Sequence, residues 1–423
     1  MIKKLFFVSF MGAISLFAQT SPAKRSCGTM KHLASLKQQR PALEQELQEY
    51  NTVLNTWIAQ HPAGKVSRSV RTIPVVFHIV YKTTEENISD EQILSQLKAM
   101  NEDFSRTNAD ASNTPTAFKS IAGNPNIQFC LAQRDPSGKP TTGIVRIKTT
   151  EDGFNDSDDG VKFKSMGGDD AWDVTQYYNI WICNFNDQGL LGYAEFPKGT
   201  ASETFGYVGT YQFTGTTSNV KPPYNKGRTT THEVGHTFNL FHIWGDDGGD
   251  CSGSDECDDT PDQGDSNGGK PTFPLTDNCT TTSPGVMFMN YMDYSDDDAM
   301  NMFTLDQVAR IDAVLNNAPY NKLLTSTACS TVTGLEEESN LYELKVYPNP
   351  ADGNFTLSFL TNEKLTCVIE IRNNLGQLFY TEKLTNVTGP YSQPIHIENA
   401  AKGVYTLSIQ NSEQKLIKKL IIH

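Results

Sequence analysis

The sequence predicts an α/β protein: a mixed, twisted sheet with helices, preceded by a helical segment and followed by a small all-β sandwich. Three patterns lead to this prediction. Strand-like and helix-like segments alternate between residues 73 and 316, which is typical of an α/β layer. Apolar residues recur every three or four positions from Lys31 to Gln60, as on one face of a helix. After Leu341 the pattern changes to short alternating strands separated by turn residues.

Length and composition set the class of protein. The chain has 423 residues, of which 37% are hydrophobic and 20% charged. These values suit two or three folded domains and exclude a collagen, a wholly disordered chain and a polytopic membrane protein. The formal net charge of −14 argues against nucleic-acid binding, because phosphate contacts need clustered Lys and Arg. It is compatible with acidic metal sites.

The first 18 residues predict a signal peptide. Two lysines precede an apolar run from Leu5 to Ala18, and polar residues follow it. The run is shorter than the roughly 20 apolar residues that span a bilayer, and no later segment is as long, so we expect no transmembrane helix. Cys27 lies too far beyond the run for lipid attachment. Export permits disulfides among the eight cysteines.

Residues 19–71 are expected to form a pro-segment. Its helical part, Lys31 to Gln60, is amphipathic and is expected to break near Pro41. Residues 61–72 combine Pro, Gly, Ser and basic residues without an apolar period, which predicts an exposed and cleavable linker.

Residues 72–325 are expected to form the main α/β domain. The pattern predicts four strands and two helices there: strands at 73–81, 127–133, 143–148 and 178–185, and helices at 90–104 and 304–316. Residues 245–265 hold nine acidic residues and no basic one among Gly and Ser, which predicts a long loop. Cys130 and Cys183 fall on core strands, where we expect small buried hydrophobes.

The C-terminal part has a different pattern. The polar stretch 326–340 predicts a linker, and residues 341–423 predict about seven short strands of a β-sandwich.

The most informative residues are 232–242, HEVGHTFNLFH. On a helix, His232 and His236 lie one turn apart on one face, so both imidazoles can bind one ion. Zinc favours nitrogen ligands, and a catalytic site keeps one position open for water. His242 can be the third ligand only if the helix ends, since ten residues of continuous helix would rotate it roughly 80° away. Asn239 stands where the turn is needed and tolerates a left-handed conformation.

Glu233 adjoins a ligand but points to a neighbouring position on the helix. There it can reach the catalytic water instead of the metal, which is the geometry of a general base. Two interpretations without a metal stay open: an amphipathic helix with three surface histidines, and a capping box formed by Thr230 and Glu233.

The pattern resembles the long zinc-binding signature of the metzincin metallopeptidases, H-E-x-x-H-x-x-G-x-x-H, with Asn239 replacing the family's glycine. Residues 290–294, NYMDY, look like the metzincin Met-turn, with Met292 as the floor of the site; core packing is the alternative role of Met292. The surroundings, HEVGHTFNLFHIWGDD and MNYMDYSDDDAMNMFT, are most similar to the pappalysin family, particularly its small bacterial members of the ulilysin type. The resemblance covers about residues 25–318.

The resemblance implies a metzincin (zincin-like) catalytic domain with one catalytic Zn²⁺ in a cleft between two subdomains, and hydrolysis of peptide bonds in proteins. It implies that Tyr294 stabilises the tetrahedral intermediate. It also implies that Asp297 lies at the base of the S1′ pocket and favours Arg in P1′, after the scissile bond. A solvated charged turn at residues 296–298 is the alternative for this last residue.

The resemblance further implies a structural Ca²⁺ in the acidic loop, where oxygen ligands suit a hard cation. Three residues match the family's calcium-ligand positions, the cysteine through its carbonyl: Asp255, Cys257 and Thr260. Cys251 and Cys279 flank this loop and could be bridged. The partner of Cys257 stays open, because Ala299 stands where the family often has a cysteine.

Cys27, in the run RSCGT, looks like the cysteine switch of pappalysin-like bacterial enzymes, in which a pro-segment thiol occupies the open zinc position. A metal-bound thiol deprotonates and displaces the catalytic water. Cleavage at Ser67–Arg68 or Val70–Arg71 would remove the thiol and would fit an Arg preference in P1′. A stray thiol or a disulfide partner is the alternative.

The C-terminal module begins KVYPNPADGNFTL at Lys345 and ends QKLIKKLIIH. It resembles the C-terminal sorting domain of proteins that the type IX system of Gram-negative bacteria exports; an adhesive or sugar-binding sandwich is the competing interpretation. The sequence thus predicts a zinc endopeptidase that is made as a latent zymogen and is secreted or stays at the cell surface. Its expected partners are protein or peptide substrates and the type IX machinery. Two rivals stay open: a gluzincin-type peptidase, with a distant Glu as third ligand, and a surface adhesin with a structural zinc.

Overall fold

The computed structural model describes residues 25–62, 69–330, 341–374, 376–398, 400–411 and 415–423. The chain divides into two compact units, Met1–Val332 and Thr333–His423. The predicted signal peptide, the candidate cleavage bond Ser67–Arg68 and most of the predicted linker 326–340 lie outside the described residues.

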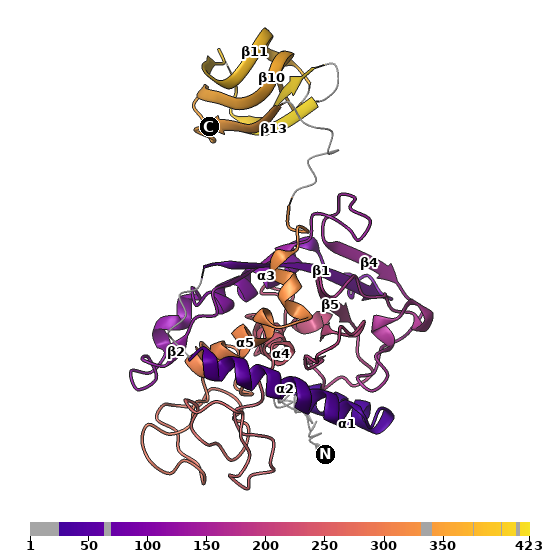
Figure 1. The fold of residues 1–423 in the computed structure, drawn as a ribbon, viewed down its shortest axis with the longest axis vertical. Helices are drawn as coiled ribbons and strands as arrows, with labels where there is room; N and C mark the ends of the chain where they lie inside the picture. The colour runs from indigo at the N-terminus through magenta and orange to yellow at the C-terminus, as the bar shows by residue number, and fades with distance from the viewer. Residues whose placement is uncertain (1–24, 63–68, 331–340, 375, 399, 412–414) are drawn as a thin grey trace, which may run out of the picture. The chain divides into compact units, whose positions relative to one another are not determined.

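A six-stranded mixed sheet forms the centre of the first unit (Figure 1). Its strands are β1 Arg71–Tyr81, β3 Ile127–Leu131, β4 Ile144–Lys148, β5 Tyr178–Cys183, β6 Gly192–Ala194 and β7 Gly206–Thr210. β1 pairs in parallel with β3, β4 and β5, and β5 pairs in parallel with β7. β6 is the antiparallel edge strand. The sequence did not predict β6 and β7, because short strands that contain Gly lack a clear alternating pattern.

Three helices pack with this sheet: α3 Asp90–Phe104, α4 Arg228–Thr237 and α5 Leu305–Asn316. Ser89 caps α3 by accepting the N–H of Gln92, and Thr304 caps α5 in a reciprocal box with Gln307. α4 contacts β6, β7 and α3, so the helix that carries the zinc motif lies directly beside the edge strand. A two-stranded ladder joins β2 Ala122–Gly123 to β8 Phe303–Thr304.

The N-terminal helical segment forms α1 Thr29–Gln39 and α2 Leu43–Gln60, which lie across the first unit in Figure 1. The chain turns between them at Pro41, which confirms the expected break. Tyr50 and Leu54 of α2 are buried in the main hydrophobic core of the unit. The linker predicted for residues 61–72 ends earlier than expected, because Arg71 begins β1 and forms an ion pair with Asp312 at 2.6 Å.

A disulfide joins Cys130 on β3 to Cys329. The expectation that Cys130 is only a small buried hydrophobe is wrong, because the Gln133 N–H donates to the Ala328 carbonyl and brings the returning chain beside β3. The first unit therefore extends past residue 325, where the sequence placed the start of the linker. Cys183 is a buried free thiol, as expected.

The second unit is all-β, as predicted. Its described residues form five strands: β9 Leu341–Tyr347, β10 Asn354–Asn373, β11 Leu378–His396, β12 Gly403–Gln410 and β13 Lys415–Ile422. All their ladders are antiparallel. The prediction of about seven short strands was wrong, because pairing between β10 and β11 continues through the register shifts between Thr361 and Cys367.

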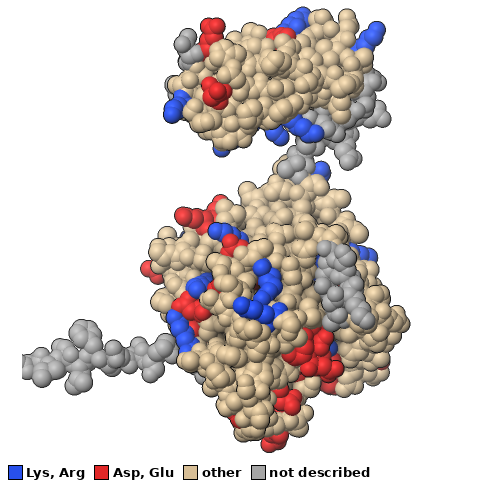
Figure 2. Space-filling view, turned by 90° about the vertical axis from the view of Figure 1, so that its left-hand side faces the viewer, with Lys and Arg blue, Asp and Glu red and all other residues tan. Residues whose placement is uncertain are grey.

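Surface charge and hydropathy complete the description of the fold. On the face of the first unit drawn in Figure 2, acidic and basic side chains form small groups among uncharged residues. Among the described residues, no helix combines the length and the apolar character that a membrane span needs.

Candidate active site

The three predicted zinc-binding histidines converge on one point. α4 ends at Thr237, and Asn239 has a φ of 67°, the left-handed conformation expected for the helix stop. The turn brings His242 back beside the helix. His236 Nε2 lies 3.2 Å from His232 Nε2 and 3.2 Å from His242 Nε2.

Hydrogen bonds at the other ring nitrogens orient these imidazoles. His232 Nδ1 donates to the Tyr291 carbonyl and His236 Nδ1 to the Leu240 carbonyl, each at 2.7 Å. A carbonyl can only accept, so each Nε2 of these two neutral rings carries a lone pair and no proton. His242 Nδ1 lies 2.9 Å from the Asp246 carboxylate, which completes the set of orienting contacts.

The donor set fits a zinc ion. Two nitrogens bound at about 2.05 Å in a tetrahedron are about 3.3 Å apart, close to the observed separations. Burial and the neighbouring rings hold the pKa values of His232 and His236 well below the ordinary value, so both stay neutral, as metal ligands must. Cys27 supplies a fourth donor, and all four donor atoms lie within 4.8 Å of one another. Three surface histidines on an amphipathic helix are therefore excluded.

Glu233 is buried beside this donor set. Its Oε2 accepts a hydrogen bond from the Thr29 hydroxyl at 2.8 Å and lies 3.3 Å from Cys27 Sγ. Burial raises the pKa of Glu233 to about 7, although these two hydrogen bonds oppose the shift. The capping-box interpretation is wrong, because Gly227 is the N-cap of α4 and the Thr230 hydroxyl contacts Tyr207 instead.

Cys27 is a free thiol and not a disulfide partner. Burial, followed by the charge of Glu233, raises its pKa well above the ordinary value. The residues around it pair with the edge strand: the Gly28 N–H donates to the Gly192 carbonyl at 2.8 Å, and the Leu191 N–H donates to the Ser26 carbonyl at 3.0 Å. The bridge between Cys27 and Gly192 is parallel. The N-terminal segment thus runs alongside β6 in the direction of that strand.

Asp297 lies in a buried pocket and not in a solvated turn. Its Oδ1 is 2.5 Å from Arg25 Nη2, and its Oδ2 accepts the N–H groups of Lys226 and Arg228 at the start of α4. The carboxylate therefore accepts backbone N–H groups at the N-terminal end of the helix. Asp298, the next residue, is exposed and pairs with Lys226.

Two residues of this pocket were not identified from the sequence. The Thr229 hydroxyl accepts a hydrogen bond from Arg25 Nη1 at 3.3 Å, and the Tyr224 ring centroid lies 4.8 Å from Arg25 Cζ. No sequence signal marks them, since a single Thr and a single Tyr match many roles. Together with Asp297 they surround a guanidinium with a carboxylate, a hydroxyl and an aromatic face.

Met292 lies beneath α4, and Tyr294 lies beside the histidines. Met292 is fully buried under α4, and Gly235 permits its close approach, because a Cβ at that glycine would lie 2.5 Å from the Met292 sulfur. The Tyr294 ring centroid is 5.1 Å from that of His242. Burial, followed by the charges of Cys27 and Glu233, raises the pKa of Tyr294 far above neutrality, so its hydroxyl keeps its proton.

The three candidate calcium residues also lie together. The Thr260 hydroxyl is 2.9 Å from each oxygen of Asp255 and 2.8 Å from the Cys257 carbonyl. Burial raises the pKa of Asp255 to about 7. The Cys257 carbonyl faces this cluster, and the Cys257 thiol is free.

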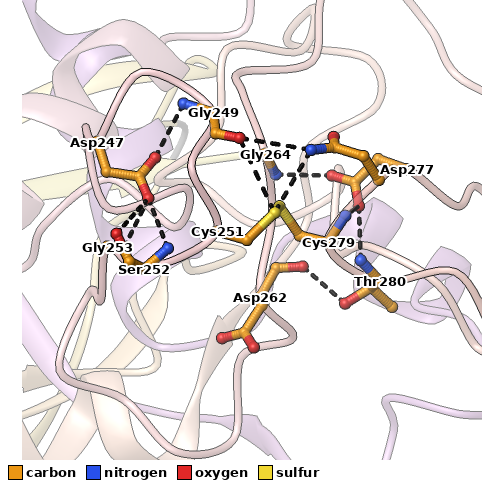
Figure 3. Close-up of a disulfide and its surroundings, with 11 residues drawn as sticks. Asp247, Gly249, Cys251, Ser252, Gly253, Asp262, Gly264, Asp277, Cys279 and Thr280 are labelled. Carbon is orange, nitrogen blue, oxygen red and sulfur yellow. Dashed lines mark hydrogen bonds between the residues drawn. A yellow bond between two sulfur atoms is a disulfide. The ribbon is translucent and has the colours of Figure 1, made fainter.

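Two other aspartates in this region, Asp247 and Asp277, accept hydrogen bonds from backbone N–H groups (Figure 3). Asp247 accepts backbone N–H groups of Gly249, Ser252 and Gly253. Asp277 does the same for three further residues: Gly264, Cys279 and Thr280. A disulfide joins Cys251 and Cys279, the pairing suggested by the sequence. These two carboxylates therefore stabilise the loop.

Known proteins resemble both units of the chain. The peptidase M43 family model, described as pregnancy-associated plasma protein-A, matches residues 163–316, and one described as a secretion system C-terminal sorting domain matches residues 345–423. A structure of a Tannerella forsythia promirolysin mutant is 46% identical, covers 71% of this chain and 97% of its own, and has a TM-score of 0.66. The chain belongs to the pappalysin family of metzincin metallopeptidases.

Further relatives agree with the family. Tannerella forsythia mature mirolysin in complex with a cleaved peptide is 50% identical, covers 64% of this chain and 100% of its own, and has a TM-score of 0.61. An extracellular metalloprotease of Arthroderma gypseum is 28% identical over 72% of this chain and 88% of its own length. This pappalysin is thus a secreted zinc metalloendopeptidase with a C-terminal sorting domain.

Proposed function

We propose that the mature pappalysin hydrolyses peptide bonds with His232, His236 and His242 as zinc ligands and Glu233 as general base. The convergence of three histidine Nε2 atoms beside a buried carboxylate is the observation that carries the proposal. When bound, zinc polarises the scissile carbonyl and lowers the pKa of a water molecule. No distant Glu is needed as third ligand, because His242 already lies with the other two histidines.

The residues of the chain then move the protons. Glu233 takes a proton from the attacking water and later gives it to the leaving amine. Tyr294 donates its hydroxyl hydrogen to the oxygen on which negative charge develops. The hydrogen bonds at Nδ1 hold the imidazole rings in place during the reaction.

The proposal includes synthesis as a latent zymogen. Residues 25–62 lie over the site, and Cys27 places its sulfur in the group of histidine nitrogens, where a thiolate would replace the catalytic water. Known relatives exist both as promirolysin and as mature mirolysin. Ser67–Arg68 is the better of the two processing bonds, because Arg71 is engaged in β1 and with Asp312.

We assign to the mature enzyme a preference for Arg in P1′. Arg25 of the pro-segment lies against Asp297 two residues from the thiol, in a pocket whose carboxylate, hydroxyl and aromatic ring suit a guanidinium. A substrate arginine would bind in the same pocket after the pro-segment leaves.

The proposal also assigns the terminal segments and the calcium site. Residues 1–18 are a signal peptide, residues 19–71 the pro-segment, and residues 341–423 a domain that the type IX machinery of a Gram-negative bacterium recognises for export. Asp255, the Cys257 carbonyl and Thr260 hold a structural Ca²⁺, since they join carboxylate, carbonyl and hydroxyl oxygens in one place.

Cleavage-site mapping in a proteome-derived peptide library tests the proposed function. The processed wild type should cut many peptides, mostly before Arg, and processed Glu233→Ala should cut almost none. A wild type that cuts nothing, or a variant as active as the wild type, would favour an adhesin with a structural zinc.

A further inference from the structure

The loop of residues 149–160 holds four aspartates, and two of them, Asp156 and Asp159, lie against the pro-segment. Asp156 Oδ1 accepts a hydrogen bond from Lys31 Nζ at 3.1 Å, and the Asp156 carbonyl accepts one from His32 Nδ1 at 2.5 Å. Asp159 Oδ2 lies 3.4 Å from His32 Nε2. Both aspartates are about 95% buried under α1 of the pro-segment. The contacts of Lys31 and His32 with these aspartates end when the pro-segment leaves.

The two carboxylates differ in what would remain after that departure. Asp159 keeps the Lys162 ammonium at 2.8 Å and the Tyr193 hydroxyl at 3.0 Å, both from the catalytic unit. Among the described residues, Lys31 is the one cation that pairs with the Asp156 carboxylate. Removal of α1 consequently exposes one uncompensated negative charge, that of Asp156.

A second side chain of α1 also lies against this loop. The His32 ring is 1% exposed and points into the loop, with its Nε2 aimed at Asp159 without a hydrogen bond. A basic residue of the pro-segment, Arg25, likewise contacts the carboxylate of Asp297. The pro-segment thus places basic side chains on carboxylates on both sides of Cys27.

The path of the pro-segment indicates which residues of a bound substrate would face the loop of residues 149–160. Arg25 occupies the pocket assigned to the residue after the scissile bond, so the residues before that bond extend past Cys27 toward α1. Gly28 is already helical and its carbonyl accepts the His32 N–H, so one residue step and one helical turn separate Cys27 from His32, a span of roughly 9 Å. Two to four residues of an extended substrate cover about the same distance.

We propose that Asp156 forms a second specificity subsite, which binds a Lys or Arg side chain two to four residues before the scissile bond and which the exposed Lys31 contacts through its ammonium in the precursor. This inference rests on the proposed peptidase function. It makes the enzyme selective for substrates with basic residues on both sides of the cleaved bond.

Matched peptides test the subsite in processed full-length protein. Each peptide carries Arg in P1′ and Lys, Ala or Glu in one of positions P2, P3 or P4. In the wild type, kcat/KM should be about two- to fivefold higher for Lys than for Ala at one position, and lower for Glu, as expected for a solvent-accessible ion pair. Asp156→Asn should abolish these ratios. Asp152→Asn should preserve them, since Asp152 is an exposed residue of the same loop that pairs with Lys82.

Three results would overturn the inference alone: equal cleavage of Lys and Ala peptides by the wild type, an unchanged ratio in Asp156→Asn, or a ratio lost equally in Asp152→Asn. If the wild type failed to cut the Ala reference peptide, the proposed peptidase function would fall, and the inference with it.

Discussion

Arg25 Nη2 lies 2.5 Å from Asp297 Oδ1, and neither side chain is more than 2% exposed. This ion pair fastens the pro-segment to the pocket beside the start of α4. When one member of so buried a pair is removed, the other charge loses its compensation, at a cost of about 3–5 kcal/mol. The pair should therefore contribute much of the affinity of the pro-segment for the enzyme.

Inhibition by a pro-segment peptide measures this contribution. A peptide of residues 25–62 should inhibit the processed enzyme, and Arg25→Ala should weaken the inhibition by roughly 100-fold or more. Lys37→Ala is the control, because Lys37 pairs with Glu44 inside the pro-segment. Equal inhibition constants for the Arg25→Ala and unaltered peptides would show that the pair does not anchor the segment.

Asp297→Asn should change the preference in P1′. Loss of the charge removes the ion pair with a substrate arginine, so kcat/KM for an Arg peptide should fall about 30-fold or more relative to a matched Gln peptide. Asp298→Asn, a change of the exposed neighbour that pairs with Lys226, should leave this ratio unchanged. If both variants keep the wild-type ratio, the pocket does not select arginine.

Asn239 links the helix stop to the pro-segment. Its Nδ2 donates to Asn51 Oδ1 of α2 at 3.2 Å, and its φ of 67° suits glycine as well. Asn239→Gly should preserve the thermal stability of the processed enzyme but weaken inhibition by the pro-segment peptide up to about tenfold.

Asn239→Ala provides the comparison, because alanine removes the same contact but strains the left-handed backbone by about 1–2 kcal/mol. It should lower the melting temperature of the processed enzyme, whereas the glycine variant should not. Similar melting temperatures for the two variants would contradict a left-handed conformation at this residue.

Asp293 should make stability depend on pH. Burial raises its pKa from 3.8 to about 6, so the folded state holds a proton that the unfolded state loses between these values. The wild type should therefore lose about 3 kcal/mol of unfolding free energy relative to Asp293→Asn as the pH rises from 3.5 to 6.5. Urea unfolding of both proteins across this range measures the difference, and a constant difference would argue against the raised pKa.

Features that depend on local sequence were predictable. The spacing of the histidines, the stop at Asn239 and the helix near residues 304–316 depend on residues within a few helical turns, and the structure has them where the sequence places them. The same holds for the break at Pro41, since proline cannot continue a helix.

Features that depend on contacts between residues far apart in the sequence were not predictable from the sequence. Arg25 and Asp297 are 272 residues apart, and Cys130 and Cys329 are 199 apart, so no local period relates them. Neither Asp156 nor Tyr224 carries a signal, because their roles come from what the pro-segment brings against them. Only the folded chain brings these residues to their partners.

Zinc content tests the central claim most directly. Purified processed wild type should hold one Zn²⁺ per molecule at the site, and His242→Ala should lose most of it, because only two of the three convergent imidazoles remain. Zinc retained in full by His242→Ala would contradict the three-histidine site and with it the metzincin mechanism proposed for this chain.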